Sequence, residues 1–217
     1  MSSVIPIRPL ELMQDESLTR SEFTDFIGVW ENFMPESVCQ QFIDLFETVY
    51  SRDSVIDVDE DAFMNGEHQF AAGALGRSDS SLLLNYVNTE LGYTCNQYLQ
   101  SCVQHYISKY SQLKTVGLFS SDIKMQKTSP GGGYHVWHYE NSSYQCSQRE
   151  LVWAIYLNDM PDGEAETEFL YQKRRIKPTV GTVVVWPAAM THVHKGNTVF
   201  TKDKYILTGW YIKLPAG

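Results

Sequence analysis

The first half of the chain has the hydrophobic spacing of helices. Apolar side chains in the segment 38–49 recur every three or four residues, the period of one helical face. A proline and an acid within 34–36 precede them, as at a helix start. A polar stretch, 52–77, separates this segment from a second apolar stripe over 84–106, for which the polar residues 78–80 are candidate N-caps. The pattern predicts two helices joined by a long loop.

The second half has the pattern of short strands separated by turns. Pro, Gly, Asn and Asp interrupt runs that are rich in β-branched and aromatic residues. The predicted strands are 115–127, 134–140, 151–157, 167–171, 182–186, 190–195 and 205–214. Helices followed by many strands indicate a mainly β core supported by helices, and a barrel or folded double sheet would leave few free strand edges. We expect one domain over 1–217, with helical support over 1–113 and the β core over 114–217.

Composition and charge narrow the class of protein. Hydrophobic residues make up 43% of the 217 and charged residues 20%, which is enough for a sizeable core and argues against disorder. The net charge of -9 argues against binding nucleic acid or an anionic membrane, because both need clustered cations. The basic run 173–177 is interpreted as a solvated strand and turn. No apolar run is long enough for a membrane helix, and the first residues do not have the pattern of a secretory signal.

Four cysteines, Cys39, Cys95, Cys102 and Cys146, form no CxxC pair, so a zinc knuckle or a redox motif is not expected. Free thiols in a helix stripe behave as small apolar groups. A reducing, cytoplasmic setting is therefore predicted. The sequence indicates no particular oligomeric state.

The candidate chemistry lies on the predicted strands. His138 and Glu140 are two residues apart, as are His192 and His194, and alternate residues of a strand point to the same side. Each pair therefore directs two potential ligands to one point. Two histidines and one carboxylate on one side, with open positions opposite, are typical of a non-haem iron(II) oxygenase. Strand period alone does not choose between His192 and His194.

The surrounding residues resemble a known family, the iron(II)/2-oxoglutarate oxygenases of the prolyl 4-hydroxylase-like group. The resemblance covers about 120–214. Its segments are, in chain order, Ser129-Pro130-Gly131-Gly132-Gly133-Tyr134 with His138-x-Glu140, Tyr156-Leu157-Asn158-Asp159, Gly163-Glu164-Ala165-Glu166-Thr167-Glu168-Phe169, Val185-Trp186-Pro187 with His192, and Lys204-Tyr205 with Thr208-Gly209-Trp210. It implies a double-stranded β-helix, or jelly roll, with helices packed on it. The acidic ligand, Glu140, stands where most of the group has Asp.

The resemblance also implies which residues bind metal. His138, Glu140 and a distal histidine would hold Fe(II). His192 is preferred as the distal ligand because it follows Trp186 at a spacing similar to that of bacterial relatives. His194 is the alternative, because its spacing to the basic residue of the last strand is also a family spacing.

The same resemblance assigns residues to the cosubstrate. Lys204 would bind the distal carboxylate of 2-oxoglutarate, with Tyr156 and Thr208 as hydrogen-bonding candidates. O2 would complete the reaction, and ascorbate is compatible with it. Asn141 and Trp137 are considered as residues that orient the metal ligands.

The expected activity is hydroxylation of a peptide or small-molecule substrate, with a peptidyl prolyl residue as one candidate. The loops 52–77 and 141–148 are placed at the site mouth, and His68 and Arg149 are candidate substrate contacts. Two alternatives stay open. One is a cupin-type metalloenzyme that does not use 2-oxoglutarate, and the other is a non-catalytic β-sheet binding domain.

Overall fold

The structure is a computed structural model that describes residues 18, 20–51, 56–61 and 75–214. Its α-helices are α1 (Glu36–Tyr50), α2 (Leu84–Val87) and α3 (Thr89–Lys109). Its strands are β1 (Ser21–Thr24), β2 (Ile27–Trp30), β3 (Ile56–Asp61), β4 (Leu75–Leu83), β5 (Leu118–Thr128), β6 (Gly133–His138), β7 (Arg149–Tyr156), β8 (Thr167–Phe169), β9 (Arg174–Ile176), β10 (Val183–Pro187), β11 (His194–Gly196) and β12 (Lys204–Lys213). Short 3-10 turns are η3 (Ser111–Thr115), η4 (Tyr144–Cys146) and η5 (Met190–His192).

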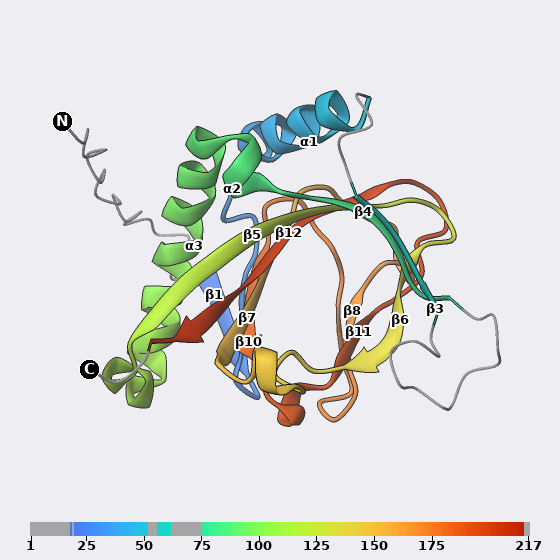
Figure 1. Ribbon diagram of the computed structural model, residues 1–217. Coiled ribbons are helices and arrows are strands. Elements are labelled where there is room, and N and C mark those ends of the chain that lie inside the picture. The colour runs from blue at the N-terminus through green and yellow to red at the C-terminus, as the bar shows by residue number, and fades with distance from the viewer. Residues whose placement is uncertain (1–17, 19, 52–55, 62–74, 215–217) are drawn as a thin grey trace.

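The strands form one antiparallel sheet that curls round a central space (Figure 1). Its order is β1-β2-β10-β7-β12-β5-β4-β6-β11-β8-β9, with β3 paired to β4. The curled sheet is the double-stranded β-helix that the resemblance implies, and it agrees with the closed or folded sheet that the strand pattern predicts. Strands from both halves of the chain lie side by side in it, because β2 pairs with β10 and β4 lies between β5 and β6.

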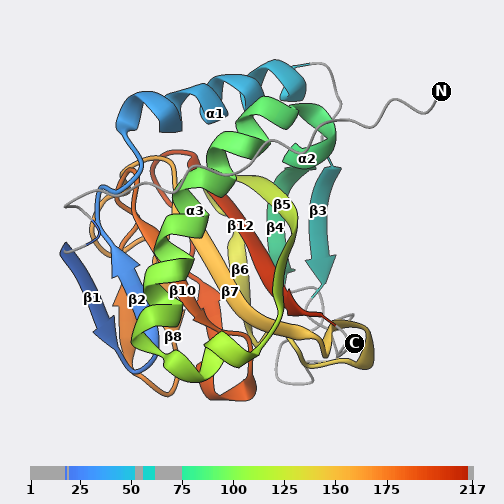
Figure 2. The ribbon, with the colours of Figure 1, turned by 90° about the vertical axis from the view of Figure 1, so that its left-hand side faces the viewer.

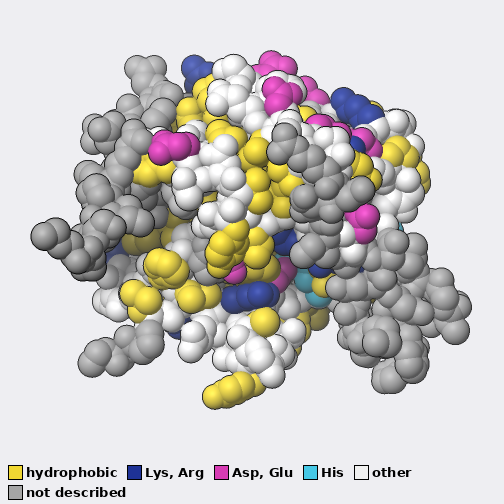
Figure 3. Space-filling view, turned by 45° about the horizontal axis from the view of Figure 1, so that its top comes forward, with side chains coloured by type: hydrophobic (Ala, Val, Ile, Leu, Met, Phe, Trp, Pro, Cys, Tyr) yellow, Lys and Arg dark blue, Asp and Glu magenta, His cyan; other side chains and the backbone are white. Residues whose placement is uncertain are grey.

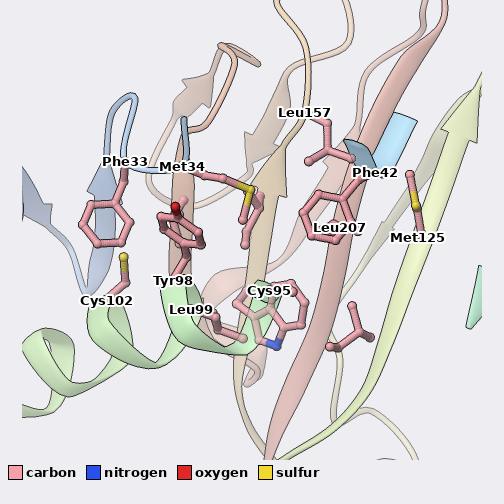
Figure 4. Close-up of a cluster of buried hydrophobic side chains, with 14 of the residues drawn as sticks. Phe33, Met34, Phe42, Cys95, Tyr98, Leu99, Cys102, Met125, Leu157 and Leu207 are labelled. Carbon is pink, nitrogen blue, oxygen red and sulfur yellow. The ribbon is translucent and has the colours of Figure 1, made fainter. Parts of the chain in front are cut away.

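The helices cover the outer face of the sheet (Figure 2). Apolar side chains of α3, such as Leu99 and Cys95, pack towards strand residues such as Leu207 and Met125 (Figure 4). Side chains of β12 point alternately to this core and to the inside of the curled sheet. Tyr205, Leu207 and Tyr211 belong to the helix-facing core, whereas Lys204, Ile206, Thr208 and Trp210 line a pocket inside the curl.

The first half of the chain contains strands that the sequence interpretation did not include. Residues 78–80, predicted as helix N-caps, lie within β4. Asp79 is buried there and accepts hydrogen bonds from Arg77 and Gln126, so pairing with the sheet outweighs the local preference for a cap. The cap of the long helix is Asn88, whose side chain accepts a hydrogen bond from the Leu91 backbone N–H at 3.0 Å.

Each predicted strand of the second half coincides at least partly with an observed strand. The segment 190–195 differs most, because it begins as the 3-10 turn η5 and becomes a strand only at His194. The basic run contributes β9. All four cysteines are free thiols, and three of them are buried. Among the described helices, none combines the length and apolar character that a membrane crossing requires.

Candidate metal centre

Two strand ends bring three potential ligands together inside the curled sheet. His138 is the last residue of β6, and it pairs in register with His194, the first residue of β11. Glu140 lies two residues beyond the end of β6. Its Oε1 atom is 3.3 Å from His138 Nε2 and 3.6 Å from His194 Nε2. Ligand atoms of the three residues all lie within 4.8 Å of one another, so one cation could contact all of them.

Backbone carbonyls orient both imidazoles. His138 Nδ1 lies 2.9 Å from the carbonyl oxygen of Val136, and His194 Nδ1 lies 2.9 Å from that of His192. A carbonyl oxygen only accepts, so each Nδ1 carries the proton and donates it. In the neutral rings the lone pair is therefore on Nε2, the atom that faces Glu140. This is the arrangement in which proteins hold histidine ligands.

Electrostatics favour an ionised carboxylate and lower the pKa of one of the two imidazoles. Burial alone would raise the pKa of Glu140, but hydrogen bonds and charge from His138 and His194 outweigh it and leave that pKa well below its usual range. Burial, with the charge of His138, lowers the pKa of His194. A carboxylate with two neutral imidazoles is a donor set that suits a divalent transition metal such as iron(II). The residues present therefore fit the metal that the resemblance implies.

His192, the preferred distal ligand from the sequence, lies outside this cluster. Its Nε2 donates to the carbonyl oxygen of Asp25 at 2.8 Å, and its Nδ1 lies 2.9 Å from Thr191 Oγ1. The ring borders a separate surface pocket with Phe26 and Tyr171. The strand rule that put both histidines on one side does not hold, because η5 rather than a strand precedes His194. The geometry thus favours the alternative, His194, over His192 as the distal candidate.

The cluster lies on the wall of a pocket with a volume of about 300 Å³. Figure 3 shows basic, acidic and histidine side chains gathered near the centre of one face, with hydrophobic side chains around them. Val152, Ala154 and Ile206 supply apolar walls, and Thr208 and Lys204 supply polar ones. The pocket therefore combines a potential cation site with a cationic side chain.

Lys204 is buried in this pocket. Its Nζ donates to the Ala165 carbonyl oxygen at 2.7 Å and lies 5.4 Å from the centre of the Tyr156 ring. Burial lowers the pKa of Lys204 to about 8, and the charge of Glu166 opposes that shift only in part. Among the described residues, no carboxylate lies within ion-pair distance of its ammonium group. A buried cation in this state favours an anionic ligand.

The other two predicted cosubstrate residues have different positions. The Thr208 side chain lines the pocket, and its hydroxyl donates to the Trp153 carbonyl oxygen at 2.8 Å. Tyr156 is fully buried behind the wall and donates to Thr167 Oγ1 at 2.7 Å. Thr167 itself lines the pocket. Thr208 can contact a ligand directly, whereas Tyr156 reaches the pocket through Thr167.

Arg149 and Trp210 contact the cluster in a way that sequence reasoning did not identify. Arg149 Nη1 and Trp210 Nε1 both donate to Glu140 Oε2, at 3.0 and 2.9 Å. Trp210 is six residues after Lys204 on the same strand face, so the period of two could have placed it in the pocket. Arg149 was a candidate substrate contact, and no sequence signal pointed to Glu140 as its partner.

The remaining candidates lie farther from the ligands. Asn141 donates to the Arg149 carbonyl oxygen at 3.4 Å, and the Trp137 ring faces the Lys195 ammonium group at 4.7 Å. Tyr134 stacks on His138 with ring centres 3.8 Å apart. His68 lies outside the described residues.

The chain is similar to known proteins in sequence over part of its length and in fold. Residues 123–212 match the model of the 2OG-Fe(II) oxygenase superfamily. A search of curated proteins gave no sequence match.

Solved structures share the fold at low sequence identity. The viral collagen prolyl hydroxylase vCPH from Paramecium Bursaria Chlorella virus-1, in its 2OG complex, has a TM-score of 0.61 at 16% identity, over 88% of this chain and 97% of that chain. A Pseudomonas putida prolyl-4-hydroxylase has a TM-score of 0.65 at 17% identity, over 88% and 94%. A Trichoplax adhaerens prolyl hydroxylase, in complex with a hypoxia inducible factor peptide fragment, has a TM-score of 0.65 at 16% identity, over 87% and 84%.

Proposed function

Because residues 123–212 of this chain match the model of the 2OG-Fe(II) oxygenase superfamily, we propose that the protein hydroxylates its substrate with Fe(II) held by His138, Glu140 and His194. One observation carries the proposal. Two Nε2 atoms and one carboxylate oxygen converge on the wall of a pocket that also contains a buried lysine. Three protein donors leave the other positions of the metal for a cosubstrate and O2.

Lys204 is proposed to bind the distal carboxylate of 2-oxoglutarate. Its buried ammonium group supports this, because a carboxylate ligand would supply the opposite charge that the described residues do not place beside it. Thr208 would add a hydrogen bond to the same carboxylate. Tyr156 would act through Thr167, since its own hydroxyl is already engaged there. The apolar walls formed by Val152 and Ile206 would keep water from the bound keto acid.

The bound metal would supply the oxidative chemistry, in which substrate C–H, 2-oxoglutarate and O2 give an alcohol, succinate and CO2. The chain's own residues hold and orient the reactants. His138 and His194 keep their protons on Nδ1 and offer Nε2 as a ligand, and the charge of Glu140 offsets part of that of the cation. Lys204 would hold the distal carboxylate of 2-oxoglutarate, and this would direct the keto group at the other end towards the metal site.

The substrate class proposed is a peptide with a prolyl residue. Support comes from the three solved structures described above. Each is a prolyl hydroxylase that shares the fold, and one is in complex with a peptide fragment. A small-molecule substrate is the other outcome of the test. A cupin-type metalloenzyme would not use 2-oxoglutarate and would need no buried lysine to bind it. A requirement for 2-oxoglutarate therefore distinguishes the proposed oxygenase from that alternative.

The test is release of succinate from 2-oxoglutarate with Fe(II) and ascorbate in air. Proline-containing peptides, free amino acids and nucleosides are compared as substrates, with mass spectrometry for a gain of one oxygen atom. We expect substrate-dependent succinate and an oxidised peptide. Oxidation of a free amino acid or a nucleoside would show that the substrate is a small molecule and not a prolyl peptide. No succinate with any substrate, and no visible absorption band from Fe(II) and 2-oxoglutarate under nitrogen, would favour a non-catalytic binding domain.

A pair of histidine variants tests the ligand set. His194→Ala should abolish Fe(II) binding and succinate release, because it removes one of three donors from the cluster. His192→Ala is the matched control, two residues away and bonded to Asp25 instead, and should keep Fe(II) affinity within a few-fold of the parent. Metal titration under nitrogen measures both. The opposite result, loss of binding in His192→Ala alone, would restore His192 as the ligand.

A further inference from the structure

The two oxygens of Glu140 have different neighbours. Oε1 faces the imidazoles of His138 and His194. Oε2 faces away from them and accepts hydrogen bonds from Arg149 Nη1 at 3.0 Å and Trp210 Nε1 at 2.9 Å. Two donors from two different strands therefore hold one oxygen and leave the other directed at the cluster.

Arg149 and Trp210 act as a unit. The Arg149 guanidinium lies 3.6 Å from the centre of the Trp210 ring, and Nη1 also donates to the Glu140 backbone oxygen at 3.2 Å. Strands β7 and β12, which carry the pair, are hydrogen-bonded neighbours. The guanidinium is thus held by an aromatic ring, a carboxylate and a carbonyl, a geometry that fixes its position better than a surface ion pair would.

From these contacts we infer that Arg149 and Trp210 are positioning residues that keep Glu140 a one-oxygen ligand. A glutamate has one more rotatable bond than an aspartate, and carboxylates bind cations through one oxygen or through both. Two-oxygen binding would occupy a metal position that the cosubstrate or O2 needs. The pair prevents it by engaging Oε2. The inference rests on the proposed metal site.

The test uses Mn(II) with the full chain and does not require turnover. Crystal structures of Mn(II) complexes show how many Glu140 oxygens contact the metal, and calorimetry measures 2-oxoglutarate binding to the same complexes. The parent protein should contact Mn(II) through Oε1 alone. Trp210→Phe keeps a ring for Arg149 but loses the N–H, and Arg149→Met loses the guanidinium. In each variant both oxygens should contact Mn(II), and 2-oxoglutarate affinity should fall about tenfold or more.

Trp153→Phe is the matched control. It makes the same change at an indole on β7 whose N–H has no hydrogen-bond partner among the described residues and which belongs to the helix-facing core. This variant should retain one-oxygen binding and parental 2-oxoglutarate affinity. Arg149→Leu, which also lacks a donor, is a second variant in case Arg149→Met fails to fold, and it should give the same result.

Two results would overturn the inference, and they are distinguishable from failure of the proposed function. Two-oxygen contact in the parent, or one-oxygen contact with unchanged affinity in both variants, would contradict the role of the pair while leaving the metal site intact. A parent protein that binds no Mn(II) would contradict the metal site, and the role of the pair with it.

Discussion

Lys204 differs in environment from an ordinary lysine because its ammonium group is buried beside a carbonyl oxygen and an aromatic ring. Each pH unit between the folded and unfolded pKa corresponds to about 1.4 kcal/mol. A pKa of about 8 in the folded protein, against 10.5 for a free side chain, therefore means a cost of roughly 3 kcal/mol for the charged form. A carboxylate bound beside the ammonium group would offset part of this cost.

Lys204→Met should stabilise the ligand-free protein. Met is similar in length and needs no counter-charge, so the free energy of unfolding at pH 7 should rise by about 1 to 2 kcal/mol after the hydrogen bond to Ala165 is lost. Urea unfolding measures the change. 2-Oxoglutarate should stabilise the parent and leave the variant unaffected. A variant less stable than the parent would mean that the charge is already compensated in the free protein.

The same lysine predicts a pH dependence of stability and binding. Its folded pKa is lowered, so the cost is fully present below about pH 8 and disappears as pH rises from there towards 10.5. The stability advantage of Lys204→Met should therefore shrink between pH 8 and 10. Over the same range the parent's affinity for 2-oxoglutarate should fall, because the neutral amine no longer attracts the carboxylate. Lys204→Arg, which keeps its charge, is the control for that loss.

At the scale of elements, two glycines show how differently the surroundings restrict a side chain. Gly181 lies against another part of the chain, whereas Gly92 lies in a helix with open space beside it. Gly181 has φ of +73°, and a Cβ there would lie 1.9 Å from the Met34 carbonyl oxygen, at the junction between the start of α1 and β10. Gly92 lies in α3, and a Cβ there would have no neighbour within 4 Å. The same substitution therefore has opposite consequences at the two sites.

Gly181→Ala should lower the free energy of unfolding by about 3 kcal/mol or more, because the backbone conformation is strained for Ala and the carbonyl oxygen has to move. Gly92→Ala should raise it by about 0.5 to 1 kcal/mol, the usual gain in a helix interior. Chemical denaturation of both variants gives the comparison. Equal effects would show that neither position is limited by its surroundings.

The elements also show what sequence pattern could and could not predict. Apolar period predicted α1, most of α3 and the strands of the second half that line the pocket, because each has one face on a core. It did not predict β4, whose residues 78–80 are good helix caps when considered locally. Pairing with β3, β5 and β6, at a distance in the chain, makes them a strand.

The sequence pattern also predicted the candidate site only in part. His138 and Glu140 could be placed together because they are two residues apart, although Glu140 lies in a turn beyond the end of β6. The choice between His192 and His194 depended on where a strand begins, and the 3-10 turn η5 decides that. The contact of Trp210 with Glu140 joins positions 70 residues apart, and that of Arg149 spans nine residues across a turn, so strand period could not indicate either contact.

At the scale of the whole molecule, metal binding should stabilise the fold. His138 and His194 lie on β6 and β11, which pair only through short stretches, so a cation shared between them would link the two strands. A ligand at one hundred times its dissociation constant stabilises the bound form by about 2.7 kcal/mol. For a chain of this size that corresponds to a rise in Tm of roughly 5 to 10 °C.

Mn(II) should therefore raise the Tm of the parent protein, and a chelator should reverse the rise. His194→Ala provides the control, because it lacks one donor and should show no increase. Scanning calorimetry with and without Mn(II) measures both. An equal rise in the variant would place the stabilising metal elsewhere.

The interleaving of early and late strands has a practical consequence for making pieces of this protein. Cutting the chain before β5 would remove β2 and β4, which leaves β10 and β5 each with one side of backbone donors and acceptors unpaired. Exposed edges of this kind recruit other chains. The span that matches the superfamily is therefore no independently foldable fragment, and recombinant versions would have to start upstream of β1 to escape aggregation.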